Sequence, residues 1–278
     1  MINAETQLYG IIGNPVRKSL SPVIHNRAFR RMGINAAYLA FEVRNVKDAL
    51  HAIRGLGIRG ASITIPFKTS VIPFLDELDA LAGRIGSVNT IVNRCGKLIG
   101  HNTDHFGALK ALEEKINLNG KKVILLGAGG AARAIAYTLK ERDCEVAIFN
   151  RSLERGARLA KKLGYTYETL SALSEMERDT RDAEVLINAT SVGMYPHEFE
   201  SPFPKRLLRK GMVVMDIVYR PLRTMLLQEA EEQGCKTIDG LGMLAYQGAA
   251  QLEIWIGQSP EANQIKADLR QSLEAEHR

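Results

Sequence analysis

The stretch from Val123 to Arg133 joins an apolar run to a helical pattern through a glycine-rich turn. Gly127, Gly129 and Ala132 stand at the spacing G-x-G-x-x-G/A, which is typical of dinucleotide-binding sites. The first glycine permits a tight turn, the second leaves room for a pyrophosphate beside the backbone, and the small third residue lets the helix pack closely on the strand. The N-terminus of that helix would offer unpaired N–H groups and a positive dipole end to the phosphates.

A second apolar run, Glu145 to Phe149, follows at the distance that a βαβ unit requires, which favours a dinucleotide site over an ordinary turn. An NAD site places Asp or Glu at the end of this strand for the ribose 2′-hydroxyl, whereas an NADP site supplies Arg. Here Asn150-Arg151-Ser152 follows, with Arg155 one turn later. Guanidinium groups bind phosphate through a planar fork of donors. We therefore expect NADP; the alternative is a solvated Arg pair on a surface helix.

In the first part of the chain, polar residues follow the ends of predicted strands, where open α/β sheets bind ligands. Ser19 and Ser21 lie beside a predicted helix start, where their hydroxyls and the helix dipole suit a carboxylate. We also expect Ser21 to cap this helix, with Pro22 at its first position. Capping alone would leave Ser19 unexplained.

A lysine and an aspartate follow two further strand ends. Lys68 lies beyond a strand that Pro66 ends, and Asp104 follows the second strand of a predicted hairpin. If the fold brings the two into contact, each stabilises the charge of the other and the pair can transfer a proton. The alternative for Lys68 is an ordinary solvated position.

His101 and His105 stand four residues apart around Asp104, a spacing that can indicate a metal site on a helix. The helix is expected to begin between Asn102 and Asp104, so the two rings would not share a helical face. We therefore expect no metal.

Strand and helix patterns alternate along the chain, and this alternation predicts an α/β fold. In the first half we expect a helix from Pro22 to Met32, helical structure between Pro66 and about Gly83, and a hairpin around Gly96. In the second half, several βα repeats follow the glycine-rich turn, as a doubly wound sheet requires.

The chain of 278 residues with 45% apolar residues is long enough for two domains with real cores. It contains no apolar run long enough for a membrane-spanning helix, and its N-terminus lacks the pattern of a signal peptide. Cys95, Cys144 and Cys235 are scattered without a C-x-x-C pair. This pattern predicts reduced, buried thiols and a cytoplasmic location.

The formal charge of +6 is unevenly distributed. Residues 1–100 carry 13 Lys and Arg against 6 Asp and Glu, and the remainder carries 24 against 25. The basic residues form no dense run and aromatic residues make up only 6%, which argues against a nucleic-acid-binding face. The excess instead suits attraction of a small anionic substrate.

Nine motifs, in order and at matching spacing over nearly the whole chain, resemble those of the shikimate dehydrogenase family. They are Asn14-Pro15 with Ser19 to Pro22 and His25-Asn26, Thr64 to Lys68, Val88 to Thr90, Asn102 to Asp104, Gly127 to Arg133, Asn150 to Ser152, Asn188 to Ser191, Asp216 to Tyr219, and Asp239 to Met243 with Gln247.

The resemblance implies an NADP-dependent, reversible reduction of 3-dehydroshikimate to shikimate, a step of chorismate and aromatic amino-acid biosynthesis. The implied fold class is α/β, with a Rossmann-type doubly wound nucleotide domain and a smaller α/β substrate domain. We expect the substrate domain in residues 1–103, the NADP-binding domain in 104–240, and helices that return to the substrate domain in 241–278. Nucleic-acid and membrane partners are not expected, and a homodimer is left open.

Carried over position by position, the resemblance makes Lys68 the catalytic acid/base and places Asp104 beside it. The Ser19 and Ser21 hydroxyls would hold the substrate carboxylate, and Tyr219 would line the same pocket. The groups implied at the ring hydroxyls of the substrate are those of Thr64, Lys68, Asn89, Asp104 and Gln247.

The implied cofactor residues form three groups along the dinucleotide. The pyrophosphate would lie against Gly127, Ala128, Gly129, Gly130 and Ala131, the 2′-phosphate against Asn150, Arg151, Ser152 and Arg155, and the part toward the nicotinamide against Thr190, Ile217, Gly240 and Met243.

The chain departs from the usual family pattern at a few positions. Ser62-Ile63 stands where Asn-Val is usual, His105 replaces a Gly, and Ser152 replaces a Thr. A dual-specificity quinate/shikimate dehydrogenase is one alternative. The residue at the end of the second strand, Asn150, is not acidic, and this argues against that alternative. A non-catalytic NADP- or ligand-sensing module is the other, and it would not need Lys68 together with Asp104.

Overall fold

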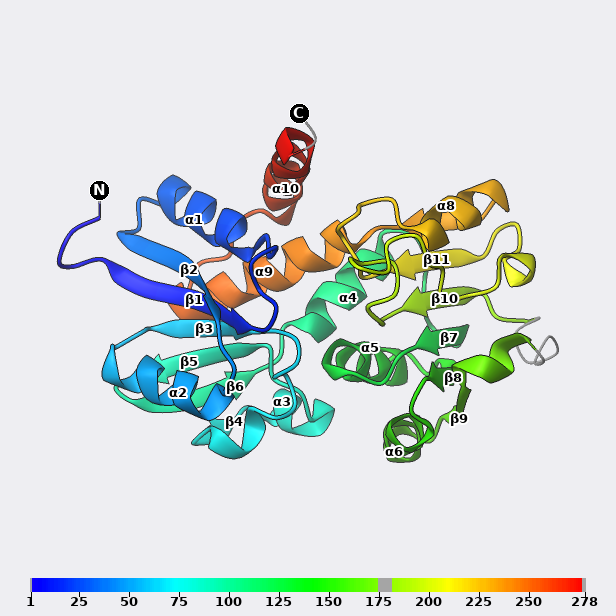
Figure 1. Cartoon of the computed structure of the whole chain (residues 1–278), viewed down its shortest axis with the longest axis horizontal. Coiled ribbons are helices and arrows are strands. Elements are labelled where there is room, and N and C mark those ends of the chain that lie inside the picture. Colours follow the sequence, from blue (N-terminus) through cyan, green and yellow to red (C-terminus); the bar gives the residue numbers. More distant parts are fainter. Residues whose placement is uncertain (1, 175–181, 277–278) are drawn as a thin grey trace. The chain divides into compact units, whose positions relative to one another are not determined.

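The computed structural model describes residues 2–174 and 182–276 of the chain. The chain divides into two compact units, the first made of Met1–Gly107 with Ala245–Arg278 and the second of Ala108–Leu244. The C-terminal helices thus belong to the first unit. The described residues form one six-stranded sheet in each unit, drawn in blue to cyan and in green to yellow in Figure 1. No helix in this part of the chain is both long and apolar enough to cross a membrane.

The first sheet combines parallel and antiparallel strands. Its three N-terminal strands are parallel, and a β-hairpin then adds two antiparallel strands around the turn at Cys95 and Gly96, as predicted. In spatial order the strands are β2 (Ala36–Glu42), β1 (Gln7–Gly13), β3 (Gly60–Ile63), β5 (Thr90–Arg94), β6 (Lys97–His101) and β4 (Glu77–Leu78).

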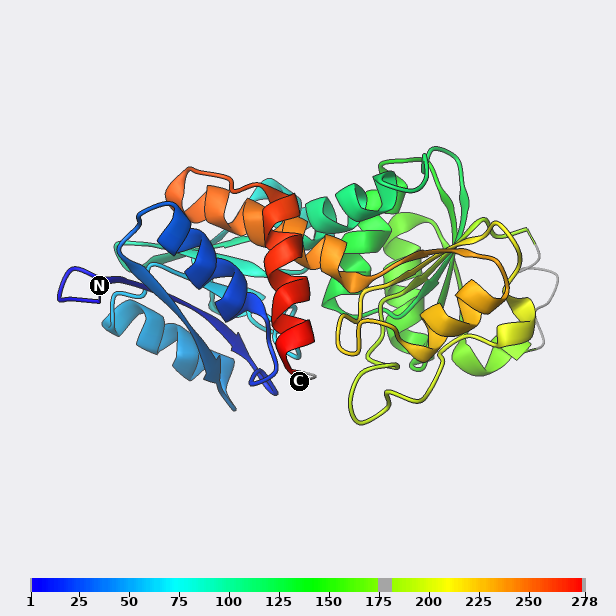
Figure 2. The same cartoon turned by 90° about the horizontal axis from the view of Figure 1, so that it is seen from above.

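Helices cover both faces of the first sheet, as the two views in Figures 1 and 2 show. The period-two pattern of β1 explains this, because Ile12 packs with α2 on one face while Tyr9 and Ile11 pack with α1 and α9 on the other. The helical elements that belong to the first unit, or reach into it, are α1 (Ser21–Arg31), α2 (Val46–Gly55), η1 (Ile72–Phe74), α3 (Ala80–Ile85), α4 (Asp104–Glu113), α9 (Gly240–Ile256) and α10 (Ala262–Glu276).

Two local predictions for the first unit are wrong. Leu20, not Ser21, is the N-cap residue of α1, and no described side chain caps this helix end. The region from Pro66 to Gly83 is not helical throughout, because the short strand β4 separates η1 from α3. β4 has only two residues and pairs with the edge of the hairpin, a tertiary contact without a local sequence pattern.

The second unit is a doubly wound sheet of parallel strands. From edge to edge the strands run β9, β8, β7, β10, β11, β12, so the first strand along the chain lies in the middle and the order reverses between β7 and β10. This is the Rossmann strand order, and such a sheet binds ligands where the order reverses. The elements are β7 (Lys122–Leu126), α5 (Gly130–Lys140), β8 (Glu145–Asn150), α6 (Leu153–Leu163), β9 (Thr166–Thr169), η2 (Leu170–Ser174), β10 (Val185–Asn188), η3 (Lys205–Leu207), β11 (Val213–Asp216), α8 (Met225–Glu232) and β12 (Lys236–Ile238).

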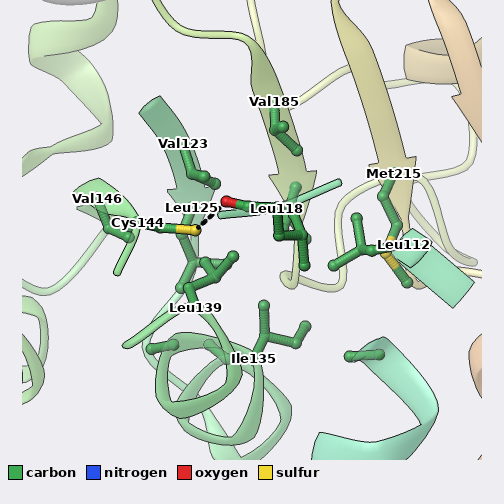
Figure 3. Close-up of a cluster of buried hydrophobic side chains, with 14 of the residues drawn as sticks. Leu112, Leu118, Val123, Leu125, Ile135, Leu139, Cys144, Val146, Val185 and Met215 are labelled. Atoms are coloured by element: carbon green, nitrogen blue, oxygen red, sulfur yellow. Dashed lines mark hydrogen bonds between the residues drawn. The ribbon is translucent and has the colours of Figure 1, made fainter. Parts of the chain in front are cut away.

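Both faces of the second sheet are buried, which is why its strands are continuously apolar. Val123 and Leu125 of β7 point into the cluster of Figure 3, against Ile135 and Leu139 of α5. The alternate residues of β7 face a second cluster on the other side of the sheet. The predicted α/β fold class is therefore confirmed, although the first unit is about as long as the second rather than smaller.

The three cysteines, all within the described residues, carry free thiols. Cys144 is buried, and its thiol donates to the Leu118 carbonyl at 3.1 Å in the cluster of Figure 3. Cys95 is exposed in the hairpin turn and Cys235 is half-buried, so the prediction that the thiols are buried is wrong at Cys95 and holds fully only at Cys144.

Candidate active site

Lys68 and Asp104, 36 residues apart in sequence, form an ion pair in the first unit. Lys68 follows β3, and Asp104 is the first residue of α4 after the hairpin ends. The Lys68 ammonium lies 2.5 Å from Asp104 Oδ2, with 16% and 5% of the two side chains exposed. A lysine and an aspartate in contact and mostly shielded from water can exchange a proton with a bound molecule.

Asn89 holds the other oxygen of this aspartate. Its amide nitrogen donates to Asp104 Oδ1 at 2.9 Å, and the same amide group lies 3.3 Å from Gln247 Oε1 on α9. The Asn89 oxygen accepts the backbone N–H of Thr103 at 2.8 Å, which fixes the orientation of the amide. Asn89, Gln247 and Asp104 are all buried. The fold therefore gathers four of the predicted substrate-site residues, counting Lys68, in one cluster.

Ser19 and Ser21 lie next to each other at the start of α1. The Ser19 oxygen accepts the backbone N–H of Ser21 and donates to the Ser21 oxygen, both at 3.2 Å. The Ser19 hydroxyl therefore lies beside the first backbone N–H of α1, although neither serine is the N-cap residue. Both hydroxyls remain grouped beside the positive end of the helix dipole, where a carboxylate would be stabilised.

Thr64 follows β3 and lies against the end of β1. Its backbone N–H donates to the Ile12 carbonyl at 2.9 Å. A Cβ atom on Gly13 would come within 2.3 Å of the Thr64 methyl, so only glycine permits this approach. Thr64 is half-buried.

The two histidines near Asp104 lie on different elements, because β6 ends at His101 and α4 begins at Asp104. His101 Nδ1 lies 2.6 Å from Asp79 Oδ2, and His105 is in the first turn of α4. Residues 2–174 and 182–276 contain no group of three or more His, Cys, Asp or Glu side chains suited to hold a metal ion.

The glycine-rich turn of the second unit has the geometry that a pyrophosphate needs. Gly127 has a φ of +111°, and a Cβ there would lie 2.9 Å from the Ala189 carbonyl oxygen. Gly129 is the N-cap of α5; no described side chain caps this end, and the space where a Cβ would be is open. The N–H groups at this helix start are therefore available for phosphate oxygens.

The residues at the end of β8 fit a 2′-phosphate. Arg151 and Arg155 are both exposed, and the Asn150 amide donates to the Ser152 carbonyl at 2.8 Å, which shapes the turn between them. Arg133 on α5 is a further cation of the second unit, and it interacts electrostatically with Arg158 of α6. Its Nε is buried without a hydrogen-bond partner in the described part of the chain, and desolvation together with a nearby arginine lowers its pKa.

A buried aspartate that was not predicted as a site residue holds the loops that follow β10 and β11. Asp216 accepts hydrogen bonds from the Asn188 amide at 2.9 Å, the Val218 N–H at 3.0 Å and the Thr224 hydroxyl at 2.7 Å. Asn188 in turn accepts from the Thr190 hydroxyl at 2.7 Å. This network fixes the segments that carry Thr190, and it follows the carboxyl ends of β10 and β11.

Ile217, Gly240 and Met243 lie on elements that follow the same end of the second sheet. Gly240 begins α9, and a Cβ there would lie 2.5 Å from the Ile217 carbonyl oxygen, so the close contact requires glycine. Met243 is buried. Tyr219, the one predicted substrate contact outside the first unit, is half-buried just after β11.

Asp216 should make the stability of the protein depend on pH. Burial is the largest cause that raises its pKa from 3.8 to about 6. Because the folded-state pKa lies above the unfolded value, stability is fully present below about pH 4 and is lost as the pH rises through about 6. A shift of this size corresponds to about 3 kcal/mol, since one pKa unit is about 1.4 kcal/mol.

Asp216→Asn removes this titration, so we expect the difference in unfolding free energy between the wild type and the variant to fall by about 2 kcal/mol between pH 4 and pH 7. Urea unfolding of both proteins across this range measures it. Other titrating groups cancel in the difference. A difference that stays constant with pH would contradict the assignment.

Comparison with protein families gives three matches along the chain. A family model described as the shikimate dehydrogenase substrate binding domain matches residues 11–91, one described as shikimate/quinate 5-dehydrogenase matches residues 108–220, and one described as the shikimate 5′-dehydrogenase C-terminal domain matches residues 240–270. The first and second matches lie in the first and second units respectively.

Individual proteins are similar over nearly the full length. A shikimate dehydrogenase (NADP(+)) from Thermococcus kodakarensis is 52% identical over 94% of this chain and 95% of its own. A crystal structure of a shikimate dehydrogenase in complex with NADP+ has a TM-score of 0.90 at 42% identity and covers 98% of each chain. The Thermus thermophilus shikimate 5-dehydrogenase in complex with NADP(H) and shikimate has a TM-score of 0.87 at 36% identity, covering 96% of this chain and all of the other.

Proposed function

The chain belongs to the shikimate dehydrogenase family, and from this premise we propose that it catalyses the NADP-dependent, reversible reduction of 3-dehydroshikimate to shikimate. The observation that carries the proposal is the shielded Lys68–Asp104 pair, held by Asn89 within the unit that the substrate-binding family model matches. A protein that only binds its ligands has no need of a proton-transfer pair at this place.

The first unit is the substrate domain in this proposal. The Ser19 and Ser21 hydroxyls, at the start of α1, bind the substrate carboxylate. Thr64, Asn89 and Gln247, with the catalytic pair, bind the ring hydroxyls. The proposal is supported by the grouping of buried polar side chains around Asp104.

Lys68 supplies the proton in the direction of reduction. Its ammonium stabilises the negative charge that develops on the substrate oxygen and then gives that oxygen a proton, while Asp104 keeps the ammonium oriented. In the direction of oxidation, neutral Lys68 takes the hydroxyl proton. Asn89 donates to the second oxygen of Asp104, which favours the orientation of the carboxylate toward the lysine.

The second unit binds NADP in this proposal, and its residues fit that group. The uncapped start of α5 after Gly129 suits the pyrophosphate, and Arg151 and Arg155 suit the 2′-phosphate. Asn188 and Asp216 hold the loop of Thr190, which we place along the cofactor with Ile217, Gly240 and Met243. When bound, NADP accepts or gives the hydride.

Small-molecule ligands are the partners that this function requires. We also propose a cytoplasmic location, because the three cysteines of the chain carry free thiols. The sequence left monomer and homodimer open, and light scattering on the purified protein would distinguish the two.

Incubation of the protein with 3-dehydroshikimate and NADPH, followed by proton NMR, tests the proposed reaction. We expect shikimate to form in an amount equal to the NADPH consumed. Binding of both compounds without conversion would contradict the proposal and favour the ligand-sensing alternative.

Ser21→Ala should weaken substrate binding more than catalysis. A hydrogen bond to a charged carboxylate contributes about 1.5–3 kcal/mol, so we expect KM for shikimate to rise by roughly 10-fold to 100-fold with little change in kcat. Ser201→Ala is a matched control, because the Ser201 hydroxyl donates to the Phe203 carbonyl in the second unit, outside the residues assigned to the site. An unchanged KM in Ser21→Ala would remove this serine from the carboxylate site.

A further inference from the structure

A buried glutamine that the sequence did not indicate lies behind Asn89. Gln251 stands one helical turn after Gln247 on α9, so the two side chains share a face of the helix. Its amide nitrogen donates to the Asn89 carbonyl at 3.1 Å and to the Thr90 hydroxyl at 2.9 Å. Only 1% of Gln251 is exposed, so no bulk water replaces these bonds.

The carbonyl end of Gln251 is fixed by a second set of buried groups. The Ser62 hydroxyl donates to Gln251 Oε1 at 2.9 Å, and the Tyr38 hydroxyl donates to Ser62 at 2.6 Å. The ring of His25 stacks on Tyr38 with 4.3 Å between the centroids. Burial lowers the pKa of His25 to about 3, so this ring stays neutral and the stack carries no charge.

These groups form one chain of donors that runs toward Asp104. Because the Thr90 hydroxyl accepts from Gln251, its own proton is directed to Asn89 Oδ1 at 2.8 Å. With that oxygen occupied, Asn89 presents its amide nitrogen to Asp104 Oδ1. The backbone N–H of Thr103 supports the same orientation. Hydrogen bonds arranged head to tail strengthen one another in a buried site.

We propose that Gln251 is a positioning residue for the reaction, which holds Asn89 and through it keeps the Asp104 carboxylate against Lys68. This role rests on the proposed function. In the part of the chain that the structure describes, no hydrogen bond joins Gln251 directly to Asp104 or Lys68; it acts through Asn89 and Thr90. Ser62 and Tyr38 belong to the same chain, because they fix the Gln251 amide.

Asn93 lies in β5, the same strand as Thr90, and provides a matched control for Gln251. Its buried amide donates to the Ile53 and Ile58 carbonyls and accepts from Gly96 N–H, at the other end of β5. Loss of either amide removes buried hydrogen bonds and should lower stability by a similar amount. Only Gln251 is connected to Asp104 by the described hydrogen bonds, so only its loss should affect the chemical step.

The test uses Gln251→Met, which keeps the length of the side chain, and Asn93→Leu as the control. At a temperature where both variants are folded by circular dichroism, we expect Gln251→Met to lower kcat by roughly 10-fold to 100-fold, the loss that a misplacement of about 1 Å produces. The kcat loss should exceed any rise in KM. Asn93→Leu should lower the unfolding temperature without a comparable loss of kcat.

The isotope effect on kcat distinguishes positioning from general destabilisation. With shikimate deuterated at the carbon that is oxidised, the effect should be larger in Gln251→Met than in the wild type, since hydride transfer becomes slower than product release. If Gln251→Met does not fold, Thr90→Val, which interrupts the chain at the next group, should show the same kcat loss and isotope effect.

A rescue of kcat by a second substitution completes the test. Ser62→Asn combined with Gln251→Ala returns an amide from β3 to the space that Gln251 leaves, and this double variant should recover most of the kcat lost by Gln251→Ala alone.

Equal kcat in the wild type and Gln251→Met, or equal losses in Gln251→Met and Asn93→Leu, would overturn the positioning role. Wild-type protein without shikimate turnover would overturn the proposed function, and the positioning role with it; normal wild-type turnover with an unaffected Gln251→Met would overturn the positioning role alone.

Discussion

Lys68→Met is expected to lower kcat by a factor of roughly 10²–10⁴, the contribution of a positioned general acid/base. Methionine fills a similar volume but can neither carry the proton nor stabilise the negative charge on the substrate oxygen. It also leaves Asp104 buried without the cation at 2.5 Å that now balances it. Steady-state kinetics of shikimate oxidation, with kcat and KM determined separately, measures the effect.

Lys97→Met is the matched control for this experiment. Lys97 also forms an ion pair in the first unit, with Glu77 at 2.5 Å, but both side chains are about half exposed. Exposed pairs contribute little to stability, so this variant should keep the wild-type kcat. A Lys68→Met enzyme with the wild-type kcat would show that the proton is exchanged elsewhere, even if the family and the substrate are as proposed.

Asn150→Asp combined with Arg151→Ala is expected to move the cofactor preference toward NAD. The variant removes one guanidinium from the end of β8 and adds a carboxylate that repels the 2′-phosphate and can bind a free 2′-hydroxyl. A charged hydrogen bond contributes about 1.5–3 kcal/mol, so kcat/KM for NADP should fall by roughly 10-fold to 100-fold from the arginine alone.

The ratio of kcat/KM for NADP to that for NAD is the quantity to compare between the wild type and this variant. Arg142→Ala is the control, because Arg142 pairs with Glu113 at 3.0 Å rather than lying at the end of β8. An unchanged ratio in the double variant would mean that Arg151 is a solvated surface residue and that other cations, such as Arg133, bind the 2′-phosphate.

The second unit was predictable because its signals are local. A parallel sheet buried on both faces requires continuous apolar strands, and the turn after β7 requires glycine at the position with positive φ, Gly127. The elements that were mispredicted depend on tertiary contacts. β4 exists because it pairs with β6, and α1 has Leu20 rather than Ser21 at its N-cap, so the helix begins one residue earlier than the capping pattern predicts.

In the candidate site, too, the residues with a local sequence signal were predictable and those set by tertiary contacts were not. Lys68 and Asp104 could be named from their positions after strand ends, but only the fold brings them to 2.5 Å. Asp216 could have been noticed as an acidic residue at the end of an apolar run, since such a group needs buried donors. Gln251 carries no local signal beyond its spacing from Gln247, because its partners Ser62 and Thr90 come from distant strands.

The most direct test of the account is the near-ultraviolet absorbance of NADPH, followed while the purified protein acts on shikimate with NADP. Parallel reactions replace NADP with NAD, or shikimate with quinate. We predict rapid NADPH formation from shikimate with NADP, and a much slower reaction with NAD because Arg151 and Arg155 take the place of an acidic residue at the end of β8. We also predict a much slower reaction with quinate, because closely similar relatives are named as shikimate dehydrogenases. Comparable rates with quinate or NAD would contradict the assigned specificity, and no absorbance change with any pair would contradict the proposed reaction.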